Sequence, residues 1–212
     1  MTHTNFREGT LETYKRDYVV LVMPAKGFNN REDIGDKLRD IWRIMYSYKP
    51  INGGGVSTGM LLTTPAETII EKIDNKTPML LGVYSDKDTV NQVIRDIKAA
   101  DHGISVVVSG LIEDTAEIAK ANGLNLHSIE YVLGIHGRRD LLPPQHIREV
   151  TTMCGHGLIS SHLVAHLLEQ VKGKKMSVDD AVTEIGKQCI CGIFNTEKAR
   201  FLFERALRAE MK

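Results

Sequence analysis

The feature that most constrains the fold is a regular alternation, across residues 17–133, of apolar β-branched runs with segments of helical periodicity. In the helical segments, such as residues 34–48, apolar side chains recur at spacings of three and four, as on a helix with one buried face. The other runs are typical of strands and cover residues 17–22, 60–62, 78–84, 104–110 and 128–133. The sequence therefore predicts strands that alternate with helices.

This alternation predicts the α/β fold class. Strands that are joined through helices need crossover connections, which favour a mostly parallel sheet with helices on its faces. Residues 60–62 form the shortest strand-like run, and a split arrangement with an antiparallel edge strand also fits the pattern. We expect a mostly parallel sheet, followed by a small all-helical C-terminal domain.

The composition changes beyond Pro143, where strand-like runs stop and helical periodicity continues. Ser177 with Asp180 resembles a capping box, and Asn195 can cap the final helix. The helices expected in this region are residues 145–152, 158–171, 178–187 and 196–209. The predicted organisation is a polar arm (1–15), an α/β domain (16–140) and a helical, cysteine-containing metal domain (141–212). The two domains can also pack as one unit.

Charge and hydropathy argue against several classes of partner. Lys plus Arg is 27 and Asp plus Glu is 27, so the formal net charge is zero and no long-range field favours nucleic acid or an anionic membrane. No window approaches the roughly 18 apolar residues of a membrane span, and the N-terminal segment lacks the apolar core of a signal peptide. We expect a cytoplasmic protein that binds any charged ligand locally.

Three cysteines, Cys154, Cys189 and Cys191, are the residues most typical of a metal site. An odd number of cysteines without a secretion signal argues against a disulfide framework. All three are predicted at helix ends beside glycines, where backbone N–H groups can stabilise thiolate or sulfide charge. Three thiolates with one iron left open form a recurring arrangement in clusters that bind substrate as Lewis acids. We predict a 4Fe-4S cluster in a protein of an anaerobe.

Three other interpretations of the cysteines stay open. Zinc is the first, because His156 completes a set of four ligands, although the single residue between Cys189 and Cys191 is tight for a zinc ribbon. A redox-active thiol pair is the second, but an intramolecular Cys-x-Cys disulfide is strained. Unrelated structural cysteines are the third.

A glycine-rich segment, NGGGVSTG at residues 52–59, is a second candidate site. The N–H groups of Gly54 and Gly55 and the hydroxyls of Ser57 and Thr58 can cradle phosphate or carboxylate. The segment lacks the Gly-Lys-Ser/Thr of a Walker motif and does not match the dinucleotide fingerprint. A flexible surface loop explains this segment equally well.

The remaining candidates follow from the expected sheet. Ligands bind beyond the carboxyl ends of parallel strands, and several polar residues follow the predicted strands. We therefore expect convergence on a small anionic ligand by Lys26, Ser85, Ser109, His136, Arg138 and Arg139. For residues 136–140 the alternative is a solvated linker whose ion pairs add little stability.

These residues suggest two main classes of function. The first is a cluster-dependent lyase or sulfur-handling enzyme that binds a small anionic substrate at the open iron, with His136 or His156 as proton donor or acceptor. The second is a non-enzymatic accessory protein, which senses redox state or matures the metallocentre of a metalloprotein partner. A zinc-stapled interaction module is a further alternative. Trp42 and Tyr46 on the first helix suit either the core or a homodimer contact.

Overall fold

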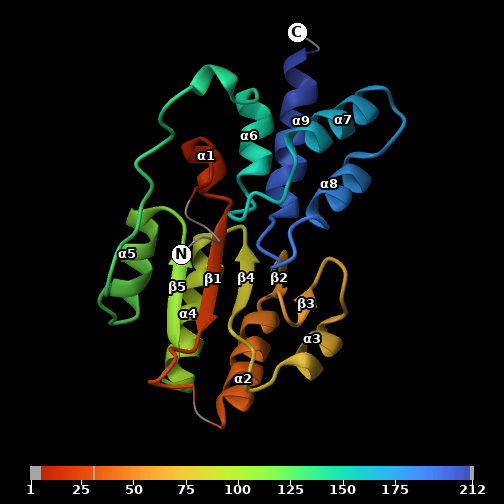
Figure 1. Cartoon of the computed structure of the whole chain (residues 1–212). Coiled ribbons are helices and arrows are strands. Elements are labelled where there is room, and N and C mark those ends of the chain that lie inside the picture. Colours follow the sequence, from red (N-terminus) through yellow and green to blue (C-terminus); the bar gives the residue numbers. More distant parts are fainter. Residues whose placement is uncertain (1–5, 31, 211–212) are drawn as a thin grey trace.

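The computed structural model describes residues 6–30 and 32–210 and contains one five-stranded sheet followed by a C-terminal helical region (Figure 1). The strands are β1 (Tyr18–Met23), β2 (Asn52–Gly55), β3 (Gly59–Met60), β4 (Leu80–Tyr84) and β5 (Ser105–Ser109). Their order across the sheet is β3-β2-β4-β1-β5, and every neighbouring pair is antiparallel. The α/β class is thus confirmed, and the mostly parallel sheet is wrong.

The error comes from assuming that strands joined through a helix are neighbours. The helices before the C-terminal region are α1 (Leu11–Tyr14), α2 (Ile34–Ser47), α3 (Ala66–Lys72), α4 (Lys87–Ala100) and α5 (Ile112–Ala121). The connection through α2 leads from β1 to β2, which run in the same direction, but β4 lies between them and runs the opposite way. The connection through α4 likewise joins β4 to β5 across β1. Both are split β-α-β units, which give alternation in sequence without parallel pairing.

Two strand assignments also need correction. The glycine-rich segment, expected as a loop, forms the buried strand β2 and the turn to β3. Residues 128–133, expected as the last strand, have no regular secondary structure. Their large apolar side chains are exposed, with Tyr131 at 69% and Leu133 at 82%. Strand propensity reflects packing on a pleated surface, and this segment has no sheet neighbour in the described part of the chain.

Side chains of the sheet alternate between two hydrophobic clusters, as the two-residue period of a strand requires. Val20 and Val22 of β1 face a cluster with residues of α2, α3, α4 and α5. Val19 and Leu21, together with Leu81 of β4, face a second cluster that includes residues of the C-terminal helices. The sheet and the C-terminal region therefore share apolar contacts.

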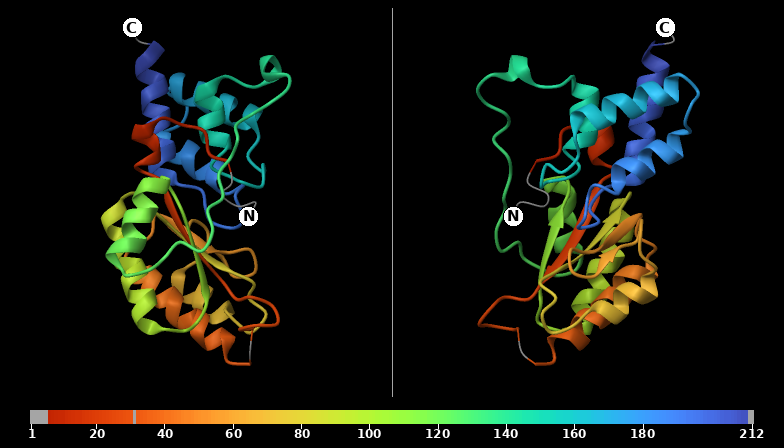
Figure 2. Two further views of the ribbon diagram at one scale, coloured as in Figure 1. Left: turned by 90° about the vertical axis from the view of Figure 1, so that its left-hand side faces the viewer. Right: turned by 45° about the vertical axis from the view of Figure 1, so that its right-hand side comes forward.

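The C-terminal region consists of the 3-10 turn η1 (Arg139–Leu141), α6 (Gln145–Thr151), α7 (Ser161–Lys172), α8 (Val178–Gly186) and α9 (Thr196–Glu210), with α6–α9 packed together. The predicted caps are confirmed: Ser177 Oγ accepts a hydrogen bond from Asp180 N at 3.0 Å, and Asn195 Oδ1 accepts one from Lys198 N at 2.9 Å. Figures 1 and 2 show the connection from α5 to η1 running along the outside of the molecule, from the sheet to these helices.

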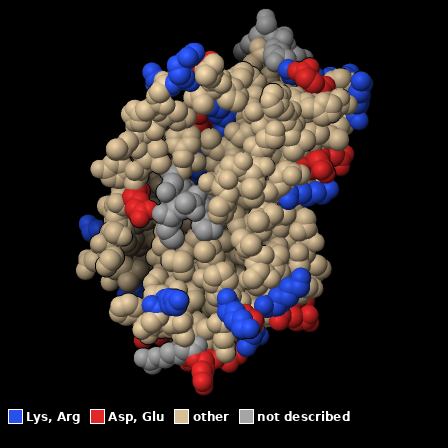
Figure 3. Space-filling view, in the orientation of Figure 1, with Lys and Arg blue, Asp and Glu red and all other residues tan. Residues whose placement is uncertain are grey.

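Surface charge is mixed. Figure 3 shows basic and acidic side chains dispersed over one face of the molecule, as the balanced composition suggests. Among the described residues, no helix is both long enough and apolar enough to cross a bilayer.

Candidate metal centre

Two short segments bring the cysteines close to one another. Cys154 lies in a turn after α6, with its N–H donating to Thr151 O, and Cys189 and Cys191 lie between α8 and α9. All three side chains are unpaired thiols and are buried. The sulfur atoms of Cys189 and Cys191 are 3.9 Å apart, and an interaction with the thiol of Cys189 raises the pKa of Cys154. Segments that are 35 residues apart in sequence, at Cys154 and Cys189, thus meet at this point.

The thiols differ in acidity. The hydrogen bond with Cys189, together with burial, raises the pKa of Cys154. The bond with Cys154 lowers the pKa of Cys189, but the bond with Cys191 and burial outweigh it and raise this pKa to about 11. The hydrogen bond from Cys189 lowers the pKa of Cys191 despite its burial. Cys191 is therefore the most acidic of the three thiols, and a bound metal ion would displace the thiol protons.

Backbone N–H groups contribute to the acidity of all three thiols. Those of His156 and Leu158 donate to Cys154, and that of Ile193 donates to both Cys189 and Cys191. Each of these hydrogen bonds lowers the pKa of the thiol that accepts it. The two turns thus provide a set of dipoles directed at thiolate charge, inside an otherwise apolar shell.

Glycines allow the turn of Cys189 and Cys191 to lie directly on the sheet. Gly192 has a positive φ of 83°, and a Cβ at this position would be only 2.9 Å from Gly53 O of β2. A Cβ on Gly53 would in turn be 2.6 Å from Leu81 O of β4. Asn52, which is fully buried, donates from Nδ2 to Phe194 O at 3.2 Å. One function of the glycine-rich segment is therefore to let the backbone around the cysteines approach the sheet closely.

A buried ion network fixes the other side of this turn. Arg7, in the predicted polar arm, pairs with Asp17 and donates from Nη2 to Ile193 O at 2.8 Å. Lys198 of α9 donates from Nζ to Asp17 Oδ2 at 2.8 Å, and Asn195 Nδ2 donates to Asp17 Oδ1 at 3.1 Å. Burial alone would raise the pKa of Asp17, but the charges of Arg7 and Lys198 hold it below its usual range. The network anchors the segment after Cys191 to the start of β1.

The two histidines proposed as catalytic lie in different surroundings. His156 is exposed, and its Nδ1 is 3.9 Å from Cys191 Sγ, so the structure brings it to the cysteines. His136 is exposed on the long connection before η1, and no contact joins it to the cysteines within the described residues. Across residues 6–30 and 32–210, no group of three or more His, Cys, Asp or Glu side chains is arranged to hold a metal ion as it stands.

The residues expected beyond the carboxyl ends of strands separate into two sets, because the sheet is antiparallel. Ser109 pairs with Val19, and Ser85 follows a residue that pairs with Tyr18, so both serines lie at the end where β1 begins. Lys26 follows the opposite end of β1 and is not brought to them. Their roles in binding an anion stay predictions, but a single site cannot contain all three.

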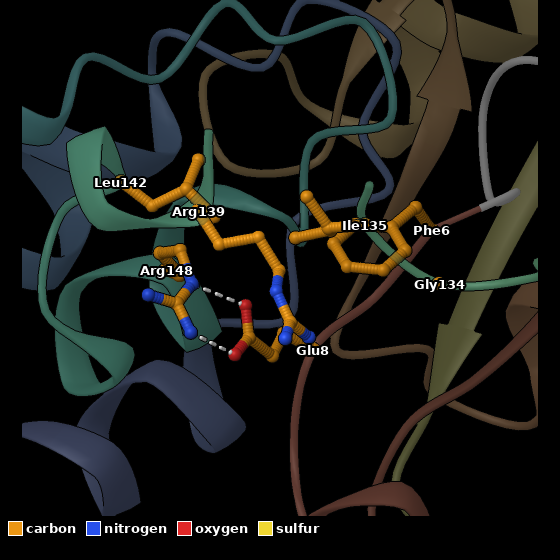
Figure 4. A pocket seen from close by; sticks show the side chains of 7 residues that line it. All are labelled: Phe6, Glu8, Gly134, Ile135, Arg139, Leu142 and Arg148. Carbon is orange, nitrogen blue, oxygen red and sulfur yellow. Dashed lines mark hydrogen bonds and ion pairs between the residues drawn. The ribbon is translucent and has the colours of Figure 1, made fainter. Parts of the chain in front are cut away.

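The other predicted ligand-binding residues differ in burial and in their contacts. Gly54 and Gly55 are buried in β2, Thr58 is buried with its hydroxyl near Gly55 O at 3.4 Å, and Ser57 is exposed in the turn. Arg138 forms an exposed ion pair with Asp140 at 2.6 Å. Arg139 lines an open pocket, whose other walls come from the N-terminal segment, the connections on either side of η1, and α6 (Figure 4).

Several residues that shape the site were not predicted. Arg7, Asp17 and Lys198 carry charges, which in a sequence indicate a solvated surface, and their burial depends on partners far apart along the chain. Asn52 precedes the glycine run directly, and a buried asparagine beside glycines is the one signal that could have been followed. No protein-family model, curated protein or solved structure matches the chain.

Proposed function

We propose that the chain is an iron-sulfur protein whose cluster is held by Cys154, Cys189 and Cys191. The observation that carries the proposal is that three buried thiols lie in two neighbouring turns, with the Cys189 and Cys191 sulfurs 3.9 Å apart and with backbone N–H groups that lower the pKa of each thiol. Hydrogen bonds to sulfur and exclusion of water are the main means by which a protein stabilises such a cluster and sets its potential. Both are supplied by the two cysteine turns and the apolar cluster around them.

The proposed cluster leaves one iron without a cysteine ligand. An iron of this kind supplies Lewis-acid chemistry to a bound oxygen or sulfur group. His156, 3.9 Å from Cys191, is exposed and can exchange protons with solvent and with a ligand held there. This arrangement supports the lyase or sulfur-handling class of enzyme. The same proposal includes an anaerobic organism, because an open iron is sensitive to oxygen, and a cytoplasmic location, because thiols stay reduced in the cytoplasm.

If the chain is a non-enzymatic accessory protein, a different behaviour of the open iron is expected. A cluster that senses redox state or is passed to a metalloprotein partner needs no exchangeable site for substrate. Adding 2-mercaptoethanol to the reduced protein distinguishes the two classes, because a thiol that binds an accessible iron changes the electron paramagnetic resonance spectrum. An unchanged spectrum would favour the accessory class.

Zinc is the second candidate, and one distance favours it. Two thiolates on one tetrahedral zinc, at Zn–S lengths of about 2.3 Å, are separated by about 3.8 Å. The Cys189 and Cys191 sulfurs are 3.9 Å apart, and His156 Nδ1 is 3.9 Å from Cys191 Sγ. A cubane cluster binds each thiolate at a different iron and therefore needs a longer distance between the sulfur atoms. Rotation of the cysteine side chains would have to provide this distance.

Serine substitutions test the three ligands. Each of Cys154→Ser, Cys189→Ser and Cys191→Ser, prepared without oxygen, should lose most of its bound iron, because a hydroxyl is a poor ligand for this metal. Met153→Leu is the matched control, since Met153 is a buried neighbour in the same cluster of apolar side chains and its replacement conserves volume. Retention of iron in the serine variants would rule out the assigned ligands.

A further inference from the structure

An open pocket of about 420 Å³ lies between the N-terminal segment, the connection before η1, and α6. Figure 4 shows the side chains that line it: Phe6, Glu8, Ile135, Arg139, Leu142 and Arg148, with Gly134 contributing backbone. Its walls combine apolar surface with a few charged groups, which is the usual composition of a small-molecule site.

Charge in the pocket is unbalanced by one positive unit. Arg148 donates from Nε and Nη2 to the two carboxylate oxygens of Glu8 at 2.7 and 2.6 Å, and from Nη1 to Pro143 O at 2.6 Å. Its guanidinium is thus satisfied within the protein. Arg139 is exposed, and its side chain makes no ion pair or hydrogen bond with any residue that the structure describes. One negative charge brought by a ligand would balance the pocket.

The apolar part of the lining defines the rest of the ligand. Phe6, Ile135 and Leu142 supply an aromatic ring and two branched aliphatic groups around the charged residues. We propose that the pocket binds a small monocarboxylate with an apolar body, and that Arg139 holds the carboxylate. A planar guanidinium with free donors suits a carboxylate in two-point contact.

The pocket lies close to the cysteine turns but does not depend on a metal. Glu8 N donates to Thr152 Oγ1 at 2.9 Å, just before Cys154, and the adjacent Arg7 reaches Ile193 O, just after Cys191. The N-terminal segment therefore lines the pocket and is hydrogen-bonded to both turns that carry the cysteines. The inference goes beyond the proposed cluster, because the contacts that define the pocket include no cysteine.

Titration of the full-length protein with benzoate tests the proposal, with benzyl alcohol as the uncharged analogue. Nuclear magnetic resonance should show saturable shifts at residues of the pocket with benzoate and much weaker binding of the alcohol. Arg139→Gln should weaken benzoate binding roughly tenfold or more, the effect of losing a charge-assisted contact. The matched control is Arg138→Gln, since the neighbouring arginine is paired with Asp140 and does not line the pocket.

Three results would overturn the inference. They are equal affinities for benzoate and benzyl alcohol, equal losses in the two arginine variants, and loss of benzoate binding in Cys191→Ser, which would place the ligand on a metal instead. Persistence of binding in Cys191→Ser is the expected result, whether or not the proposed cluster forms.

Discussion

At the scale of single residues, the most informative position is Gly192, whose backbone conformation and close approach to Gly53 both exclude a side chain. Gly192→Ala should destabilise the protein by at least about 2 kcal/mol, because backbone strain adds to a clash with Gly53 O. The control is Gly103→Ala, where φ is also positive at 65° but nothing lies within 4 Å of the added Cβ.

Urea unfolding of these two variants measures the difference. Gly103→Ala should cost only about 1 kcal/mol, the strain of a left-handed alanine. Equal costs in both variants would mean that the close approach of Gly192 to β2 adds nothing, and the account of the glycine-rich strand would fail.

A second residue-scale prediction concerns Asp17, whose folded-state pKa lies below its ordinary value of 3.8. Because the folded pKa is depressed, the ionised carboxylate stabilises the protein above about pH 4, and this contribution is lost as the pH falls through the folded-state pKa. Asp17→Asn should therefore cost about 3 to 5 kcal/mol at pH 7, the usual cost of breaking a buried pair. The difference in free energy of unfolding between the wild-type protein and Asp17→Asn should shrink as the pH falls below 4.

Urea midpoints measured between pH 3 and pH 7 check this sign. Asp140→Asn is the control, since Asp140 also pairs with an arginine but at the exposed surface, where little stability is expected. If the loss of stability in Asp17→Asn did not change with pH, Asp17 would not be ionised in the folded protein as proposed. Sequence could not reveal this network, because the partners of Asp17 are Arg7 and Lys198, at opposite ends of the chain.

At the scale of elements, the helices were predicted well and the strands less so. The period of residues 34–48 and the caps at Ser177 and Asn195 act locally, and the structure contains them as expected. A strand instead depends on a neighbour that the local sequence does not specify. The segment at residues 128–133 has strand-forming residues but no paired partner in the described sheet.

Proline substitution tests this element-scale difference. Val132→Pro should change the free energy of unfolding by less than about 1 kcal/mol, because an exposed, unpaired segment loses no ladder hydrogen bond. Val20→Pro, in the central strand β1 between β4 and β5, should cost about 3 kcal/mol or more. If Val132→Pro were as damaging, residues 128–133 would have to be paired in solution.

At the scale of the whole molecule, two features that sequence separates are joined. The antiparallel order places β2 beside β4, so the glycine-rich strand lies where the C-terminal helices cover the sheet, in contact with the turn of Cys189 and Cys191. The position of the cysteines at helix ends was predicted from the sequence, but their position against the sheet depends on strand order. Strand order follows from which segments pack together, and a single sequence carries little information about it.

The central claim is that the three cysteines hold a cluster of iron and sulfide. The most direct test is to measure iron, acid-labile sulfide and zinc in the full-length protein purified without oxygen. The account predicts about four irons and about four sulfides per chain, with little zinc. One zinc per chain, with neither iron nor sulfide even after anaerobic reconstitution, would contradict it and favour the tetrahedral site completed by His156.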